Sequence, residues 1–85
     1  MAVHETHPQI VKRLRRIEGH VRTIAVMIEE GRSCAEVAQQ MHAVERALHG
    51  AKETFIRDHL DHCLDEAVAT KGKSLREFKE ITKYL

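Results

Sequence analysis

A long predicted helix between residues 34 and 69 constrains the fold of this chain more than any other feature. Apolar side chains recur from Val37 to Phe55 at alternating spacings of four and three residues, and the whole stretch has no proline and only Gly50 to weaken a helix. A helix of that length spans roughly 54 Å at about 1.5 Å per residue. A chain of 85 residues is too short to cover it on every side, so its remaining faces need partner chains. The apolar members are Val37, Met41, Val44, Leu48, Ala51 and Phe55.

A first helix with the same alternation is predicted before Gly31, the residue that would end it. Thr6 and Gln9 fit a capping box with Pro8 in the first turn, and Ser33 begins the long helix. The apolar stripe of the first helix consists of Ile10, Leu14, Ile17, Val21, Ile24 and Ile28.

A third, short amphipathic helix is predicted after Thr70, Lys71 and Gly72. Ser74 and Glu77 fit a capping box at its start. Its apolar residues are Leu75, Phe78, Ile81 and Leu85.

The three predicted helices account for the chain as one all-α domain over residues 1–85, with no strand alternation, repeat or linker. Hydrophobic residues make up 42% of the chain, but tryptophan is absent, so the core is mainly aliphatic. Chains of this size bury a modest core and need a staple, a metal or a partner. The composition therefore also favours an oligomer.

Cys34, His59 and Cys63 form a ligand set for a soft metal, with two thiols and one imidazole. His59 and Cys63 are four residues apart, which places them on one face of a helix. Cys34 lies 25 residues before His59, about 37 Å away on a continuous helix at about 1.5 Å per residue. If all three bind one ion, Cys34 must come from a second, antiparallel subunit. Two sulfurs and one nitrogen favour Cu(I), with Ni(II) or Zn(II) as alternatives.

Basic residues are concentrated on the first predicted helix, although the formal net charge of the chain is only +1. Four of them lie largely opposite the apolar stripe and form a ridge, with Arg13 at its edge. Such a ridge, repeated over several subunits, would attract phosphates, although charge alone also fits an ordinary solvated face. The four are Lys12, Arg15, Arg16 and Arg22.

No apolar run approaches the roughly 18 residues of a membrane span, and the first residues lack the order of a signal peptide. We therefore expect a cytoplasmic protein. In a reducing compartment, two free cysteines indicate a metal or redox site rather than a disulfide.

Four sequence segments resemble the CsoR-type family of bacterial metal- and stress-sensing repressors. They are RLRRIEGHVRTI at 13–24, GRSC at 31–34, QQMHAVERALHGAKE at 39–53 and HLDHC at 59–63. The resemblance implies a three-helix subunit with a long second helix, an antiparallel four-helix-bundle dimer, and a dimer of dimers that binds operator DNA without a helix-turn-helix. It also implies that Cu(I), bound between subunits, releases the DNA and derepresses metal-efflux or resistance genes.

The resemblance assigns roles to further residues. A carboxylate on the third helix holds the ligating histidine in such proteins, and Glu77 and Glu80 are the candidates here. Arg13 matches a DNA-contacting arginine of copper-sensing members. Arg46 and Lys52 are weaker candidates for DNA contacts.

Other functions remain open at this stage. Nickel- and cobalt-sensing relatives add a histidine ligand near position 2, where this chain has Ala2 but offers His4 and His7 close by. The persulfide-sensing branch lacks the histidine that His59 provides here. A copper chaperone would need no basic ridge, and an enzyme would need a pocket and an oxyanion motif that a three-helix chain scarcely offers.

Overall fold

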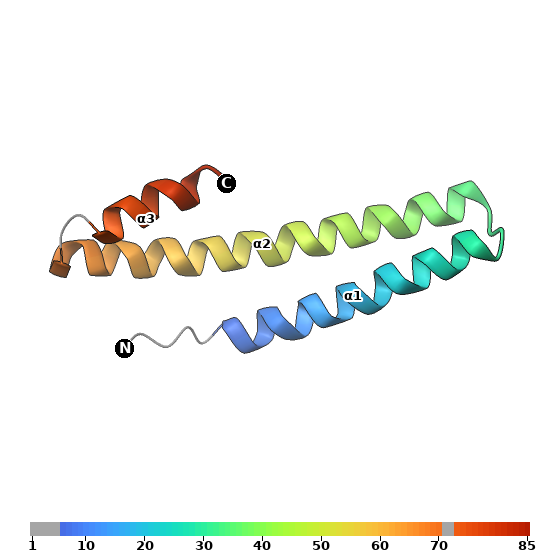
Figure 1. The fold of residues 1–85 in the computed structure, drawn as a ribbon, viewed down its shortest axis with the longest axis horizontal. Helices are drawn as coiled ribbons and strands as arrows, with labels where there is room; N and C mark the ends of the chain where they lie inside the picture. The colour runs from blue at the N-terminus through green and yellow to red at the C-terminus, as the bar shows by residue number, and fades with distance from the viewer. Residues whose placement is uncertain (1–5, 71–72) are drawn as a thin grey trace.

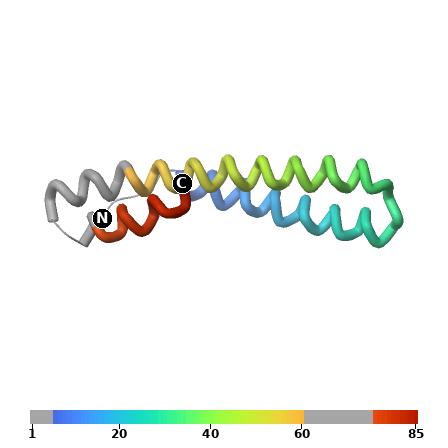
Figure 2. Tube along the Cα trace, turned by 90° about the horizontal axis from the view of Figure 1, so that it is seen from above, coloured from blue at the N-terminus to red at the C-terminus, as the bar shows by residue number. Residues whose placement is uncertain are grey.

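A computed structural model describes the backbone of residues 6–70 and 73–85, and the side chains of 6–60 and 76–85. These residues form three helices, α1 (His7–Glu29), α2 (Cys34–Thr70) and α3 (Lys73–Thr82). The described residues contain no strand, so the all-α prediction is confirmed. Both shorter helices pack against α2, with α1 along its N-terminal part and α3 along its C-terminal part (Figures 1 and 2).

The turn between α1 and α2 is fixed by local hydrogen bonds. Gly31 has a φ of 74°, its N–H donates to the carbonyl of Ile28 (3.1 Å), and the N–H of Arg32 donates to the carbonyl of Met27 (3.0 Å). This pair of bonds is a Schellman motif, which needs a residue in the left-handed region at the glycine position. The predicted end of the first helix is confirmed.

The caps predicted at the starts of the helices are confirmed only in part. The N–H of Glu36 donates to Ser33 Oγ (3.2 Å), as predicted at the start of α2. Thr6 is the N-cap residue of α1, but it has a helical conformation and its side chain makes no capping bond. The predicted capping box at Thr6 is therefore wrong. At the third helix, α3 begins at Lys73, one residue before the predicted cap Ser74, whose side chain lies outside the described residues.

The continuous α2 helix makes the subunit elongated. The molecule measures 56 × 23 × 14 Å, and its radius of gyration is 17.4 Å, whereas a compact domain of this length would have about 12 Å. No described helix is long and apolar enough to cross a membrane.

Only one half of each apolar repeat is covered within the subunit. Ile10 and Ile24 of α1 and Ala51 of α2 are no more than 5% exposed, and Ile17 and Val44 are half-buried between them. These residues follow one another at spacings of seven, which is the inner seam of the α1–α2 hairpin.

The other half of each repeat faces outward. Its six members are between 41% and 54% exposed. Together they form a continuous apolar band along both helices, of the kind that marks an interface with another protein. We call this band the outward stripe; it consists of Leu14, Val21, Ile28, Met41, Leu48 and Phe55.

The outward stripe predicts that Leu48→Glu will dissociate the oligomer. Burying each leucine contributes about 1.5–3 kcal/mol, and two copies per dimer make the dissociation constant rise by at least about 100-fold. Sedimentation velocity across a concentration series measures this change. Ala43→Glu adds the same charge on another exposed face of α2 and is expected to leave assembly intact. If Leu48→Glu and Ala43→Glu had the same dissociation constant, the outward stripe would not be part of the interface.

Candidate metal centre and nucleic-acid surface

The first two predicted metal ligands lie at opposite ends of the hairpin. Cys34 is the exposed first residue of α2, next to the α1–α2 turn. His59 lies 25 residues later on the same unbroken helix, about 37 Å away at about 1.5 Å per residue. One subunit therefore cannot bring these two side chains to one ion. Cys63 is one turn beyond His59 on α2, and its side chain lies outside the described residues.

Cys34 borders a shallow apolar hollow of about 390 Å³ at the turn end of the hairpin. Ile28 and Met41, which line the hollow, both belong to the outward stripe. Any chain that covers the stripe at this end also comes up against the Cys34 thiol. The hollow is thus placed to receive a partner's side chains.

The imidazole of His59 is held by its own helix. Its Nδ1 lies 3.2 Å from the carbonyl oxygen of Phe55, one turn earlier, and the two rings lie 4.3 Å apart. Because a carbonyl can only accept, this contact favours the tautomer with the proton on Nδ1. Nε2 then carries the lone pair for a metal, and ligating histidines usually donate their other N–H in this way.

His7, predicted as a possible extra ligand, lies beside His59 in the structure. It is the first residue of α1, and its ring stacks on that of His59 with centroids 5.4 Å apart. Asp58 completes the group, with an Oδ2 atom 3.7 Å from Nε2 of His7. Potential ligand atoms of the three residues lie within 4.8 Å of one another. His4, the other predicted extra ligand, lies outside the described residues.

Asp58 had not been identified from the sequence. The sequence feature that could have identified it is its position directly before the predicted ligand His59, because a carboxylate there can add an oxygen donor. Adjacent helix positions point about 100° apart, however, so sequence spacing alone argues against joint ligation. Only the approach of α1 brings His7 to both.

The two predicted carboxylates of the third helix are both exposed on α3. Glu80 pairs with Lys83 within the helix, at 3.3 Å. α3 runs back along the C-terminal part of α2 (Figure 1). That Glu77 or Glu80 orients His59 stays a prediction; in this structure the partner of His59 Nδ1 is the carbonyl oxygen of Phe55.

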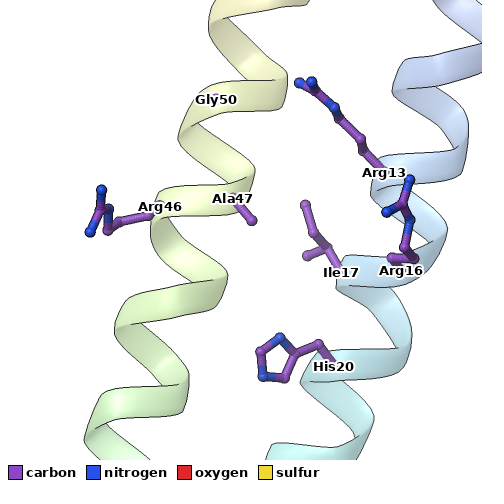
Figure 3. A pocket seen from close by; sticks show the side chains of 7 residues that line it. All are labelled: Arg13, Arg16, Ile17, His20, Arg46, Ala47 and Gly50. Atoms are coloured by element: carbon purple, nitrogen blue, oxygen red, sulfur yellow. The ribbon is translucent and has the colours of Figure 1, made fainter.

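Three of the predicted DNA-binding residues line one cavity of about 390 Å³ between α1 and α2. Arg13 extends from α1 toward α2 near Gly50, whereas Arg46 projects from α2 away from α1 (Figure 3). Arg16 also lines the cavity, and all three guanidinium groups belong to exposed residues. This concentration of positive charge around a recess suits an anionic group such as a phosphate.

The remaining basic residues are spread along the hairpin. Lys12 and Arg22 are exposed on α1, and Arg15 forms a loose ion pair with Glu18 at 4.0 Å. Lys52 lies on a different hollow, near Tyr84 and Leu85 at the end of the chain. These residues can add to the positive field, but they do not line the arginine cavity.

His20 and Gln40 join α1 to α2 beside that cavity. Gln40 Oε1 lies 2.6 Å from Nε2 of His20, so the ring nitrogen donates and the amide oxygen accepts. No firm role for Gln40 followed from the sequence. Its role within the subunit is to fix the two helices that carry the arginines.

A comparison with family models decides what kind of protein this geometry belongs to. Residues 6–84 match the model of the metal-sensitive transcriptional repressor, nearly the whole chain. The chain belongs to this repressor family. The predicted CsoR-type membership is thereby confirmed, and its relatives are regulators rather than enzymes.

Two curated members of the repressor family are similar in sequence. The copper-sensing transcriptional repressor RicR of Mycobacterium tuberculosis is 49% identical over 61 residues, covering 72% of this chain and 64% of RicR. The copper-sensing transcriptional repressor CsoR of Bacillus subtilis is 36% identical over 81 residues, covering 88% of this chain and 80% of that protein. The chain thus spans less than two thirds of RicR.

A solved structure of the family is also similar. The nickel-responsive transcriptional regulator InrS superposes with a TM-score of 0.81 and 35% sequence identity, covering 99% of this chain and 97% of InrS. A relative named for nickel thus has the fold of a chain whose sequence relatives are named for copper. The fold does not fix the metal.

The arginine cavity predicts that Arg13→Ala will weaken binding to operator DNA. Each lost phosphate contact lowers the slope of log K against log salt by about 0.9 and reduces affinity most at low salt. Fluorescence anisotropy over a salt series measures both quantities. Arg76→Ala removes the same charge from exposed α3 and serves as the control. Parallel salt curves for Arg13→Ala and the unmodified protein would exclude Arg13 from the interface.

Proposed function

We propose that this protein is a Cu(I)-responsive transcriptional repressor. It binds operator DNA as the metal-free oligomer and releases the DNA when Cu(I) binds, so that genes for metal efflux or resistance are expressed. Its place of action is the cytoplasm. The copper-sensing relatives RicR and CsoR support this choice of metal, and the position of Cys34 and His59 on one unbroken helix carries the structural argument.

The outward stripe supports an antiparallel pairing of two subunits as a four-helix bundle. Leu48 is the middle member of the stripe on α2, so a twofold axis near Leu48 pairs the stripe with itself. Cys34 lies fourteen residues before Leu48, and the position fourteen residues after it falls between His59 and Cys63. The same pairing that covers the stripe thus sets Cys34 of one subunit level with the partner's remaining two ligands.

The donor set fits Cu(I) better than a harder ion. Thiolate sulfur and imidazole nitrogen are ligands of Cu(I), and three of them suffice for trigonal coordination. Zn(II) would require a fourth ligand. The Cu(I) ligands in this proposal are Cys34 of one subunit with His59 and Cys63 of the other.

Basic residues on α1 provide the DNA surface of the proposed repressor. The inner seam packs α1 directly on α2, the helix that carries all three metal ligands. A metal that binds two subunits together therefore acts on the same bundle that presents the arginines. In a dimer of dimers the arginine cavity occurs four times, which gives the broad positive field that a duplex needs.

A nickel or cobalt sensor is the second candidate. The nickel-responsive InrS has the same subunit fold, and His7 lies next to His59, where it could add a nitrogen ligand. Imidazole and thiolate ligands also suit Ni(II). Comparing DNA release by Cu(I) and Ni(II) separates the two candidates.

The repressor proposal predicts that one Cu(I) per subunit weakens operator binding by about 5–150-fold, the range of typical allosteric coupling. Anisotropy of a labelled operator fragment, recorded without oxygen, measures this change. His59→Ala is expected to abolish it, whereas His49→Ala, on an exposed turn of α2, retains it. If neither Cu(I) nor Ni(II) changes operator affinity, the chain is not a sensor of these metals.

The shared site predicts complementation between defective subunits. Cys34→Ala subunits and His59→Ala/Cys63→Ala subunits each lack a complete ligand set. A mixed dimer regains one of its two sites, which X-ray absorption would show as Cu(I) bound by two sulfurs and one nitrogen. Mixing two preparations that both carry Cys34→Ala is the matched control. Failure of the mixed dimers to regain a site would contradict the intersubunit arrangement.

A further inference from the structure

We propose that His7, Asp58 and His59 form a second metal site, complete within one subunit, for a divalent first-row cation such as Zn(II), Co(II) or Ni(II). This site shares His59 with the Cu(I) site, so the two ions exclude each other. The competition between them rests on the proposed function, whereas the binding of a divalent cation does not.

The donor atoms distinguish this site from the thiolate set. Two imidazole nitrogens and one carboxylate oxygen suit borderline divalent ions, and they lack the sulfur that Cu(I) favours. Three protein ligands leave open positions for water, as in many sites with two histidines and one carboxylate.

To hold an ion, the three ligand atoms must close in by a short distance and the stacked imidazole rings must turn their lone pairs toward it. The three ligand atoms lie within 4.8 Å of one another. In a tetrahedral site with metal–nitrogen bonds of about 2.0–2.1 Å, neighbouring ligand atoms are about 3.3 Å apart, so each atom moves inward by less than about 1 Å. His7 and Asp58 are only partly exposed, at 39% and 24% of their side chains. The group is thus half-shielded from water but open to an entering ion.

Phe55 holds both imidazoles in place for this ligation. Its ring stacks on that of His7 with centroids 5.4 Å apart and lies 4.3 Å from that of His59. Its backbone carbonyl is the partner of His59 Nδ1. One residue therefore gathers a ligand from α1 and two ligands from α2 in one place, which reduces the entropic cost of bringing them together.

Competition follows from the single lone pair of His59. Because Nδ1 lies against the Phe55 carbonyl, Nε2 is the ring nitrogen that this proposal assigns to either metal. One nitrogen lone pair cannot bind two ions. A divalent cation on His7 and Asp58 keeps His59 within its own subunit, and Cu(I) must displace it to recruit the imidazole.

Titration with Co(II) alone tests the site in the full-length, untagged Cys34→Ser/Cys63→Ser protein. We expect about one Co(II) per subunit, with visible d–d absorption and no sulfur-to-cobalt charge transfer. Adding His7→Ala or Asp58→Asn should weaken binding by at least about tenfold, since even residues behind a ligand cost 10–100-fold. His49→Ala, whose ring pairs with Glu53 at 2.8 Å, is the matched control. Circular dichroism confirms that each variant keeps its helices.

Unchanged Co(II) affinity in both His7→Ala and Asp58→Asn would overturn the site. Competition is measured separately, in protein with both cysteines, as the Cu(I) concentration that half-releases operator DNA. Saturating Zn(II) should raise that concentration, and His7→Ala should remove the increase. An increase that persists in His7→Ala would overturn the competition. If Cu(I) never releases DNA, the repressor proposal fails while the Co(II) result stands.

Discussion

The uncovered apolar half of the α1–α2 hairpin is the constraint on which the rest of this structure depends. The inner seam closes the hairpin, but the outward stripe leaves six large apolar residues between 41% and 54% exposed. Exposure on that scale opposes a stable monomer because burial of apolar area is the main favourable term in folding. The outward stripe therefore favours assembly, and in the proposed dimer a site that spans two subunits comes with it.

The length of α2 converts this constraint into a sensing geometry. Ligands about 37 Å apart on one rigid helix, at about 1.5 Å per residue, meet only when a second helix runs the opposite way. An ion bound between them stabilises one relative placement of the two subunits. That placement also sets the spacing of the arginine cavities, since α1 is tied to α2 by the inner seam and by the contact between His20 and Gln40.

The fold was predictable from the sequence because its information is local and periodic. The heptad spacing gave three helices, and Gly31 and Ser33 gave the turn between the first two. The predicted cap at Thr6 is wrong because its backbone is already helical and its side chain makes no capping hydrogen bond. The contact of His7 with Asp58 and His59 could not be predicted from the sequence either. It depends on the register of α1 along α2, which the turn and the packing of Ile10 and Ile24 set together.

The two ligand sets around His59 differ in their dependence on assembly. His7 and Asp58 reach the imidazole within one subunit, whereas Cys34 can reach it only from a partner. A ligand shifts an equilibrium only by its difference in affinity between two states. The affinity for an ion held by His7, Asp58 and His59 does not depend on how the subunits are placed. The affinity for an ion held by the thiolates does depend on it. Several metals can therefore bind this protein while only some of them produce a signal, and metal selectivity can arise at that second step.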